Sequence, residues 1–425
     1  MTRGIVSRRG LRKAGVVLVA MSIAFAACGD DKNSSGGSAD TTATADTTAT
    51  ADTTATADTT ATADTTAATD IVAEAKRITD LAKSGLVWAA QDSDVASADI
   101  VAQTAWQGPT EAVTKAEAGK SVSVVICAPG TACEVAGNYV VEAAKLLGWK
   151  AEIVPGAGTP DSFNTAFASA IAKKPDAIIG IAVPDLAVGA QLAEAKKAGI
   201  VTVSIADVPT ATNADSPYDA YVSYRMPLMH QVLAYSVIAD TEGAANVILI
   251  NDSAFPNLVT SNEQFTKVMA GCSGCKVTQV DWQITDALDP VKADAAITAA
   301  LQANPDANYV VLPYSIGFPS VIEAVRKAGK SDSVKVVTKD GDAVGLGAVA
   351  KGDSPFNAGV GLDWVAYAGI DQVARGLAGQ AYVGAEQTGL GVHLWSKDDT
   401  ASDGSSDYTK WVDFKSEYKK LWGLG

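Results

Sequence analysis

The stretch that decides the fold is "KPDAIIGIAVPD" at residues 174–185, because "NPDANYVVLPYS" at residues 304–315 repeats its pattern. Each stretch runs from a Pro-Asp pair into a short apolar segment. Each is followed by a segment that ends in a basic pair and Ala-Gly, at 196–199 and at 326–329. A short buried strand followed by a helix is the repeating unit of a parallel sheet. The chain therefore carries one such unit in each of two halves.

The surrounding sequence extends this alternation. From Lys120 onward, short β-branched runs alternate with Ala-rich helical segments. We therefore predict an α/β fold of two Rossmann-like lobes with parallel sheets, joined by a hinge. The predicted boundaries are 120–223 plus 363–385 for lobe 1, and 224–362 plus 386–425 for lobe 2.

Two lobes of this kind indicate a binding function. In an open parallel sheet, ligands bind beyond the carboxyl ends of the strands. Two facing lobes would therefore enclose one small molecule in a cleft and close on it by a hinge motion. A duplication that serves only stability or a dimer interface is the alternative.

Residues 1–28 have the features of an export signal. A basic region at 3–13 precedes an apolar run at 16–27 that is too short to span a bilayer comfortably. "FAAC" at 25–28 resembles the lipobox of bacterial lipoproteins, which implies a lipid anchor on Cys28 and a place on the extracytoplasmic face of the cell membrane. An ordinary signal peptide cut near Ala27 is the alternative, and export by the Sec or the twin-arginine route stays open.

Residues 29–69 predict a tether. The unit "ADTTAT" occurs four times from Ala39 to Thr62, and no large apolar side chain lies between Ala39 and Ala68. Such a segment cannot offset its ordering entropy, so we expect it to be disordered. Residues 70–119 then form a lead-in segment, and apolar positions at helical spacing near its start predict a helix.

Charge and motif content argue against two classes of function. The formal net charge of −15 disfavours nucleic-acid binding. The sequence has no GxSxG, HExxH or P-loop motif, and its two histidines are His230 and His393. We expect no enzyme activity, no cofactor and no metal.

Four cysteines follow Cys28 in two close pairs. Their even number in an exported chain predicts disulfides that join Cys127 to Cys133 and Cys272 to Cys275. A redox pair or half of a zinc site is the alternative for "GCSGCK", although the segment follows a helical stretch and precedes a strand.

Several side chains lie where cleft residues are expected, just after strands or at crossovers between lobes. Arg225 is the candidate cation for a ligand carboxylate or hydroxyl. Aromatic side chains at such positions can pack against a ligand or fill the core. They are Tyr224, Phe255, Tyr314, Phe318 and Trp364.

The chain from about Gly119 to Gly379 resembles the ribose/galactose type (type I) of periplasmic substrate-binding lipoproteins of ABC importers. The resemblance lies in the two repeated stretches, in "VIEAVRKAGKSDSVKVVTKDGD" at 321–342 and in "DWVAYAGIDQVARGLAGQ" at 363–380. "WQGPTEAVTKAEAGKSVSVV" at 106–125 is similar to actinobacterial members. The resemblance implies a monomer that delivers a sugar or polyol to an ABC permease and its ATPase. A nucleoside, an amino acid or an aromatic compound is the alternative ligand, and sensing for a membrane signalling receptor is the alternative role.

The resemblance also implies some site residues. Asp340 stands where such receptors carry an Asp that accepts hydrogen bonds from ligand hydroxyls, and Asp207 stands in place of an Asp-Arg pair. Ala132 and Cys133 replace the aromatic pair that stacks on a sugar ring, which makes Cys133 a candidate ligand contact, and Leu288 replaces a third aromatic. We therefore expect no aromatic sandwich around a hexose.

Overall fold

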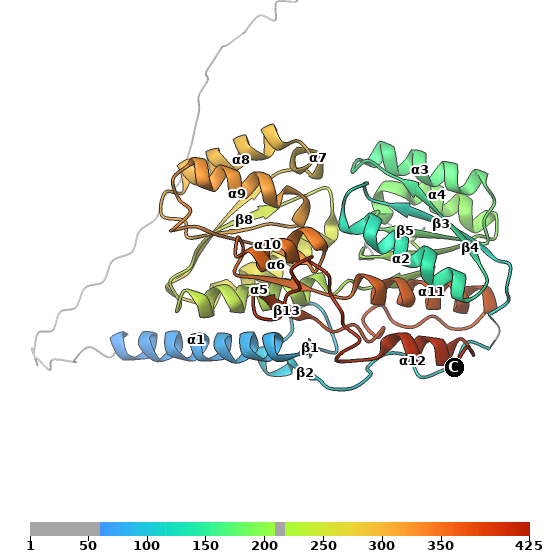
Figure 1. Cartoon of the computed structure of the whole chain (residues 1–425), viewed down its shortest axis with the longest axis horizontal. Helices are drawn as coiled ribbons and strands as arrows, with labels where there is room; N and C mark the ends of the chain where they lie inside the picture. Colours follow the sequence, from blue (N-terminus) through green and yellow to red (C-terminus); the bar gives the residue numbers. More distant parts are fainter. Residues whose placement is uncertain (1–59, 115, 209–216) are drawn as a thin grey trace, which may run out of the picture. The chain divides into compact units, whose positions relative to one another are not determined.

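The computed structural model describes residues 60–114, 116–208 and 217–425, with side chains from residue 70 onward. All of these residues belong to one compact unit, 58–425. They form two large sheets with helices on both faces (Figure 1) and a small two-stranded sheet, so the predicted α/β class is confirmed.

Lobe 1 contains a five-stranded parallel sheet in the order β4-β3-β5-β6-β7. Helices α2 and α11 cover one face of this sheet, and α3 and α4 cover the other (Figure 1). The strands are β3 (Ser121–Ile126), β4 (Lys150–Pro155), β5 (Ala177–Ile181), β6 (Val201–Ile205) and β7 (Ala220–Val222). The helices are α2 (Ala132–Leu146), α3 (Pro160–Ala172), α4 (Asp185–Lys197) and α11 (Leu362–Ala378).

Lobe 2 contains a six-stranded sheet in the order β13-β12-β11-β10-β8-β9. It is parallel except for its edge strand β13, which runs antiparallel to β12. The strands are β8 (Asn246–Asn251), β9 (Lys276–Asp281), β10 (Tyr309–Val311), β11 (Lys335–Asp340), β12 (Phe356–Gly359) and β13 (His393–Ser396). The helices are α5 (Met226–Asp240), α6 (Pro256–Ala270), α7 (Ile284–Ala287), α8 (Pro290–Ala303), α9 (Phe318–Lys327) and α10 (Ala343–Lys351).

The two lobes share one topology. In each lobe the first strand lies between the second and the third, and the two repeated stretches form these third strands, β5 and β10. Gly199 and Gly329 lie two residues beyond the ends of the helices that follow, and their φ angles of 72° and 68° are the left-handed values that glycine adopts without a Cβ penalty. The repeat predicted from sequence is therefore a repeat of structure.

The lead-in segment begins with helix α1 (Thr60–Ser84), followed by β1 (Leu86–Trp88), the short 3₁₀ helix η1 (Ser97–Asp99) and β2 (Val101–Gln103). The apolar stripe of α1 is buried, and Thr79 of α1 hydrogen-bonds Ser236 of α5 at 3.3 Å. Because α1 begins at Thr60, residues 60–69 are helical, which corrects the predicted tether. Packing of the apolar stripe nucleates the helix, and extending it through residues 60–69 then avoids the cost of a new nucleus. The rest of the tether, the export signal and Cys28 lie outside the described residues.

The C-terminal residues divide between the lobes. The prediction assigned 386–425 to lobe 2, and β13 does lie in that sheet. Helix α12 (Phe414–Leu421), however, packs on α11 of lobe 1, where Phe414 stacks on Trp364 at 4.6 Å and Trp422 donates a hydrogen bond to Asp371. This aromatic contact joins distant parts of the chain, so sequence spacing could not predict it.

No helix in the described part of the chain is long and apolar enough to cross a membrane.

Candidate functional site

A pocket lies at the carboxyl ends of strands from both lobes. The empty space in it amounts to about 620 Å³, a figure that includes open solvent at its mouth. Lobe 1 lines it mainly with Cys127, Thr131, Ala132, Cys133, Ala136, Ile181, Ala182 and Ala206. Lobe 2 lines it mainly with Phe255, Asn257, Leu258, Ile284, Tyr314, Ser315, Lys339, Asp340 and Asp342. The chain therefore has the cleft between lobes that the duplicated sequence predicts.

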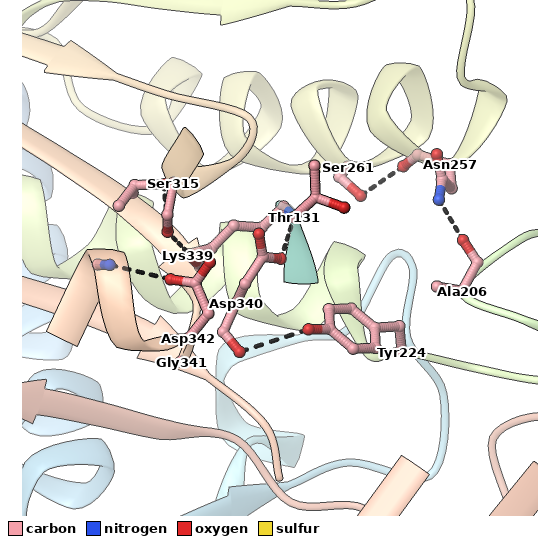
Figure 2. A network of polar contacts seen from close by, with 12 residues as sticks. Thr131, Ala206, Tyr224, Asn257, Ser261, Ser315, Lys339, Asp340, Gly341 and Asp342 are labelled. Atoms are coloured by element: carbon pink, nitrogen blue, oxygen red, sulfur yellow. Dashed lines mark hydrogen bonds and ion pairs between the residues drawn. The ribbon is translucent and has the colours of Figure 1, made fainter. Parts of the chain in front are cut away.

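The two lobes touch across this pocket. The side-chain amide of Asn257, in α6, donates a hydrogen bond to the carbonyl oxygen of Ala206, which follows β6 (Figure 2). Phe163 of lobe 1 and Phe255 of lobe 2 meet edge to face with ring centroids 6.3 Å apart. These contacts hold the lobes in a closed arrangement.

A charged pair lies at the end of β11. Lys339 and Asp340 are both buried, and Lys339 Nζ lies 2.6 Å from Asp340 Oδ1 (Figure 2). Tyr224, at the crossover between lobes, donates a hydrogen bond to the carbonyl oxygen of Asp340 at 3.4 Å. Asp340 has a φ of 95°, a strained value for a residue other than glycine. Such strain concentrates at ligand sites, and Asp340 is one of the residues that line the pocket.

Asp342 adds a second carboxylate beside this pair. It caps α10 by accepting a hydrogen bond from the amide of Gly345 at 2.9 Å. Burial, together with the nearby charge of Asp340, raises the pKa of Asp342 to about 6. Ser315 closes the cluster by donating to the carbonyl oxygen of Lys339 at 2.9 Å (Figure 2).

Tyr314 forms an aromatic face on lobe 2. Its ring stacks on Trp282 with centroids 6.0 Å apart, and its hydroxyl donates to Asp252 at 3.3 Å. Burial and the Asp252 carboxylate raise the pKa of Tyr314, so its hydroxyl remains protonated and acts as a donor. The ring is therefore fixed in position before any ligand binds.

The structure brings five of the predicted ligand-binding residues to the pocket and leaves four outside it. Those that line it are Asp340, Tyr314, Tyr224, Phe255 and Cys133. The lining residues do not include Asp207, Arg225, Trp364 or Phe318. Ala132 and Cys133 line it at the positions that the resemblance gives to an aromatic pair, whereas Leu288 is exposed outside it.

Arg225 corrects the prediction of a ligand cation. Its side chain is fully buried, and its Nη1 lies 2.5 Å from Asp92 Oδ1 of the lead-in segment. It also donates to the carbonyl oxygen of Ala89 and lies over the Trp88 ring at 6.0 Å. The guanidinium therefore joins the lead-in segment to the hinge.

The other three residues outside the pocket also have partners in the protein. Trp364 is fully buried between Trp106 and Phe414. Phe318 lies in the apolar core of lobe 2. Asp207 turns into lobe 1, where it accepts a hydrogen bond from the amide of Asp185, and burial raises the pKa of Asp207 to about 7.

Sequence reasoning missed Lys339 and Asn257. Lys339 is 1% exposed although it lies in a run of β-branched residues, and a lysine inside a buried strand was the available signal. Asn257 is 4% exposed, and its Oδ1 has no hydrogen-bond partner among the residues that the structure describes. No pattern in the sequence marks Asn257, because its position depends on the contact between lobes.

Both predicted disulfides are confirmed. The bond between Cys127 and Cys133 joins the end of β3 to the start of α2 at the pocket wall. The bond between Cys272 and Cys275 closes the turn between α6 and β9. Within the described ranges, no group of three or more His, Cys, Asp and Glu side chains is placed to hold a metal.

This fold and this pocket define a class of two-lobed proteins that bind small molecules between their lobes. Comparison with family models gives the particular family. Residues 122–381 match the periplasmic binding protein domain, so the chain belongs to that family. No curated protein matches the chain.

Solved structures with the same fold come from several bacteria. An ABC sugar transporter subunit from Rhodobacter sphaeroides is 19% identical with a TM-score of 0.56, and the match covers 66% of this chain and 99% of that one. A solute-binding protein from Burkholderia graminis in complex with D-arabinose is 17% identical with a TM-score of 0.59, covering 68% and 99%. One from Agrobacterium vitis bound with α-D-tagatopyranose is 20% identical with a TM-score of 0.59, covering 69% and 99%. These likenesses confirm the two-lobed fold.

Proposed function

We propose that this protein is an extracytoplasmic solute-binding lipoprotein that captures a sugar or polyol between its lobes and delivers it to an ABC importer. Its partners are the ligand, an ABC permease with its ATPase, and the membrane that holds the lipid on Cys28. The protein acts as a monomer and performs no chemistry on the ligand. The family match and the sugars named with the similar structures support this proposal.

The observation that carries the proposal is the buried Lys339–Asp340 pair at the wall of the pocket between lobes. A buried carboxylate and ammonium have more hydrogen-bonding capacity than they use on each other. Ligand hydroxyls both donate and accept, so they can use the capacity that remains. The site is thus built for a hydroxylated molecule.

Lobe closure supplies the mechanism. A ligand in this pocket contacts both lobes only when they are closed, so its binding energy shifts the population toward the closed form. The permease would then distinguish loaded from empty protein by the relative position of the lobes.

A thermal-shift screen of the full chain tests the function. Pentoses, hexoses, polyols, nucleosides and amino acids are compared, and a sugar or polyol is expected to raise the melting temperature by mass action. A shift with nucleosides or amino acids and with no carbohydrate would contradict the proposal.

Substitution of Asp340 tests the site. Asp340→Ala is expected to weaken binding of the best sugar by about 2 kcal/mol or more, measured by calorimetry on folded protein. Asp332→Ala, at an exposed position on the same lobe, is the control and should bind as the wild type does. Equal affinity of the two variants would remove Asp340 from the site.

A further inference from the structure

The two walls of the pocket differ in polarity. The lobe 1 wall consists of the Cys127–Cys133 disulfide and small or aliphatic side chains, with Thr131 as its polar side chain. The Thr131 hydroxyl is already engaged, because it donates to Ala128 O at 2.7 Å and accepts from Cys133 N at 3.2 Å. Lobe 1 therefore offers the ligand an apolar surface.

Backbone groups of this wall are engaged as well. The amide of Ala182 donates to Ile205 O at 2.8 Å, and the amide of Ala206 donates to Val222 O at 3.1 Å. The carbonyl oxygen of Ala206 accepts from Asn257. The two amides maintain the sheet, so they cannot donate to a ligand without losing those bonds.

The lobe 2 wall carries the charged and amide side chains of the pocket, and it forms the polar edge of the site. Lys339 retains donors beyond its bond to Asp340, and Asn257 Oδ1 is an acceptor without a partner among the described residues. Asp340 adds a further acceptor oxygen. A ligand group that faces this edge must both donate and accept hydrogen bonds, as a hydroxyl does and a carboxylate does not.

Charge at the site disfavours an anionic ligand. Among the described residues that line the pocket, Lys339 is the only cation. Asp340 pairs with it at 2.6 Å, and Asp342 adds a second carboxylate. His230 is fully buried, and burial with the nearby charge of Lys339 lowers the pKa of His230 to about 3, so it adds no positive charge. An anionic ligand would bring an unpaired charge into a buried site.

We propose that the ligand is a neutral deoxygenated carbohydrate, that is, a sugar or polyol in which hydroxyls line one edge and a methyl group or unhydroxylated carbons face lobe 1. The assignment rests on the proposed function and narrows it. A hydroxyl that faced the lobe 1 wall would lie against apolar side chains and Thr131, whose proton is already donated to Ala128 O, and the loss of its hydrogen bonds to water would lower affinity about tenfold or more. A methyl group there would instead bury apolar surface against Ile181 and the disulfide.

Matched sugars test the assignment by calorimetry on the full chain at neutral pH. The pairs are L-rhamnose with L-mannose, L-fucose with L-galactose, and 6-deoxy-D-glucose with D-glucose, and each pair differs by one hydroxyl. Any other sugar or polyol that binds best is compared with its own monodeoxy analogues. We expect a deoxy sugar to bind at least tenfold more tightly than its parent in the best-binding pair.

The possible results distinguish failure of the deoxy assignment from failure of the proposed sugar-binding function. A parent sugar that binds as tightly as every one of its deoxy analogues overturns the deoxy assignment and leaves the sugar-binding function in place. Binding of nucleosides or amino acids without any carbohydrate overturns the proposed function itself.

A substitution on lobe 1 supplies a second test. Ala132→Ser adds a hydroxyl to the apolar wall at the start of α2, where serine is well tolerated. It is expected to reduce the preference for the deoxy sugar at least threefold. Val135→Ser, on the exposed face of the same helix, should leave the preference unchanged. An Ala132→Ser variant that keeps the wild-type preference would show that the ligand does not face this wall.

Discussion

Breaking the ion pair at the hinge should destabilise the protein without changing the pocket. Arg225 is fully buried and contacts Asp92 at 2.5 Å, and Asp92 also accepts a hydrogen bond from Ser223. The Asp92→Asn variant keeps the shape of the side chain and removes its charge. The guanidinium then remains buried without its counter-ion, although its hydrogen bond to Ala89 O persists.

The magnitude follows from the burial and the distance. With charge centres about 4 Å apart and an effective dielectric constant of about 20, the lost attraction is about 4 kcal/mol. Removal of one partner from a buried pair destabilises proteins by about 3–5 kcal/mol. We therefore expect the free energy of unfolding of Asp92→Asn to fall by at least about 3 kcal/mol, a large part of the stability of a typical domain.

Urea denaturation of ligand-free protein, followed by circular dichroism, measures the loss. The double variant Asp92→Leu/Arg225→Met removes both charges and should lose at least about 1 kcal/mol less than Asp92→Asn, because it leaves no unpaired charge. Ligand affinity of folded Asp92→Asn should stay within threefold of wild type. A loss of stability below about 1 kcal/mol, or a tenfold loss of affinity at unchanged stability, would refute the reasoning. The second result would return Arg225 to the role of ligand cation.

Two further predictions concern the disulfides and a buried carboxyl. Cys127→Ser/Cys133→Ser and Cys272→Ser/Cys275→Ser should each lower the free energy of unfolding by about 2 kcal/mol, because both bonds close short loops. Calorimetry should show weaker ligand binding in the first double variant alone, since only that bond lines the pocket. Asp207, with a pKa of about 7 in the folded protein against an ordinary 3.8, destabilises the wild type progressively as pH rises from about 4 to about 7. Asp207→Asn should therefore match the wild type near pH 4 and exceed its free energy of unfolding by up to about 4 kcal/mol at pH 8 in urea titrations. A stability difference that does not grow with pH would contradict this.

The sequence predicts the features that local pattern determines. Strands β5 and β10 are short apolar runs beside Pro-Asp pairs, so period and composition place them in equivalent positions of two sheets. Parallel strands bring their carboxyl ends to one edge, which is why Asp340, Tyr314 and Phe255 could be placed at the pocket from their positions after strands. For these residues, a position just after a strand is enough to place the side chain at the pocket.

The errors share a physical cause, which is a partner far away in the chain. Arg225 follows a strand as a ligand residue would, but its counter-ion, Asp92, lies in the lead-in segment. Trp364 begins a helix at a crossover, but Trp106 and Phe414 cover its faces. Local sequence shows that such a side chain needs a partner. It does not show whether the ligand or another part of the protein provides it.

The lead-in segment has a structural role at the hinge between the lobes. Its helix α1 packs on α5 of lobe 2, and Val87 of β1 pairs with Val392 in the connection to β13. Farther along, Val113 donates a backbone hydrogen bond to Leu421 of α12, which packs on lobe 1. A segment attached to both lobes and to a connection between them must adjust whenever the lobes separate. Its buried contacts therefore contribute to the free-energy difference between the open and closed forms. The Asp92–Arg225 pair is the contact through which this contribution can be measured, because one substitution removes it.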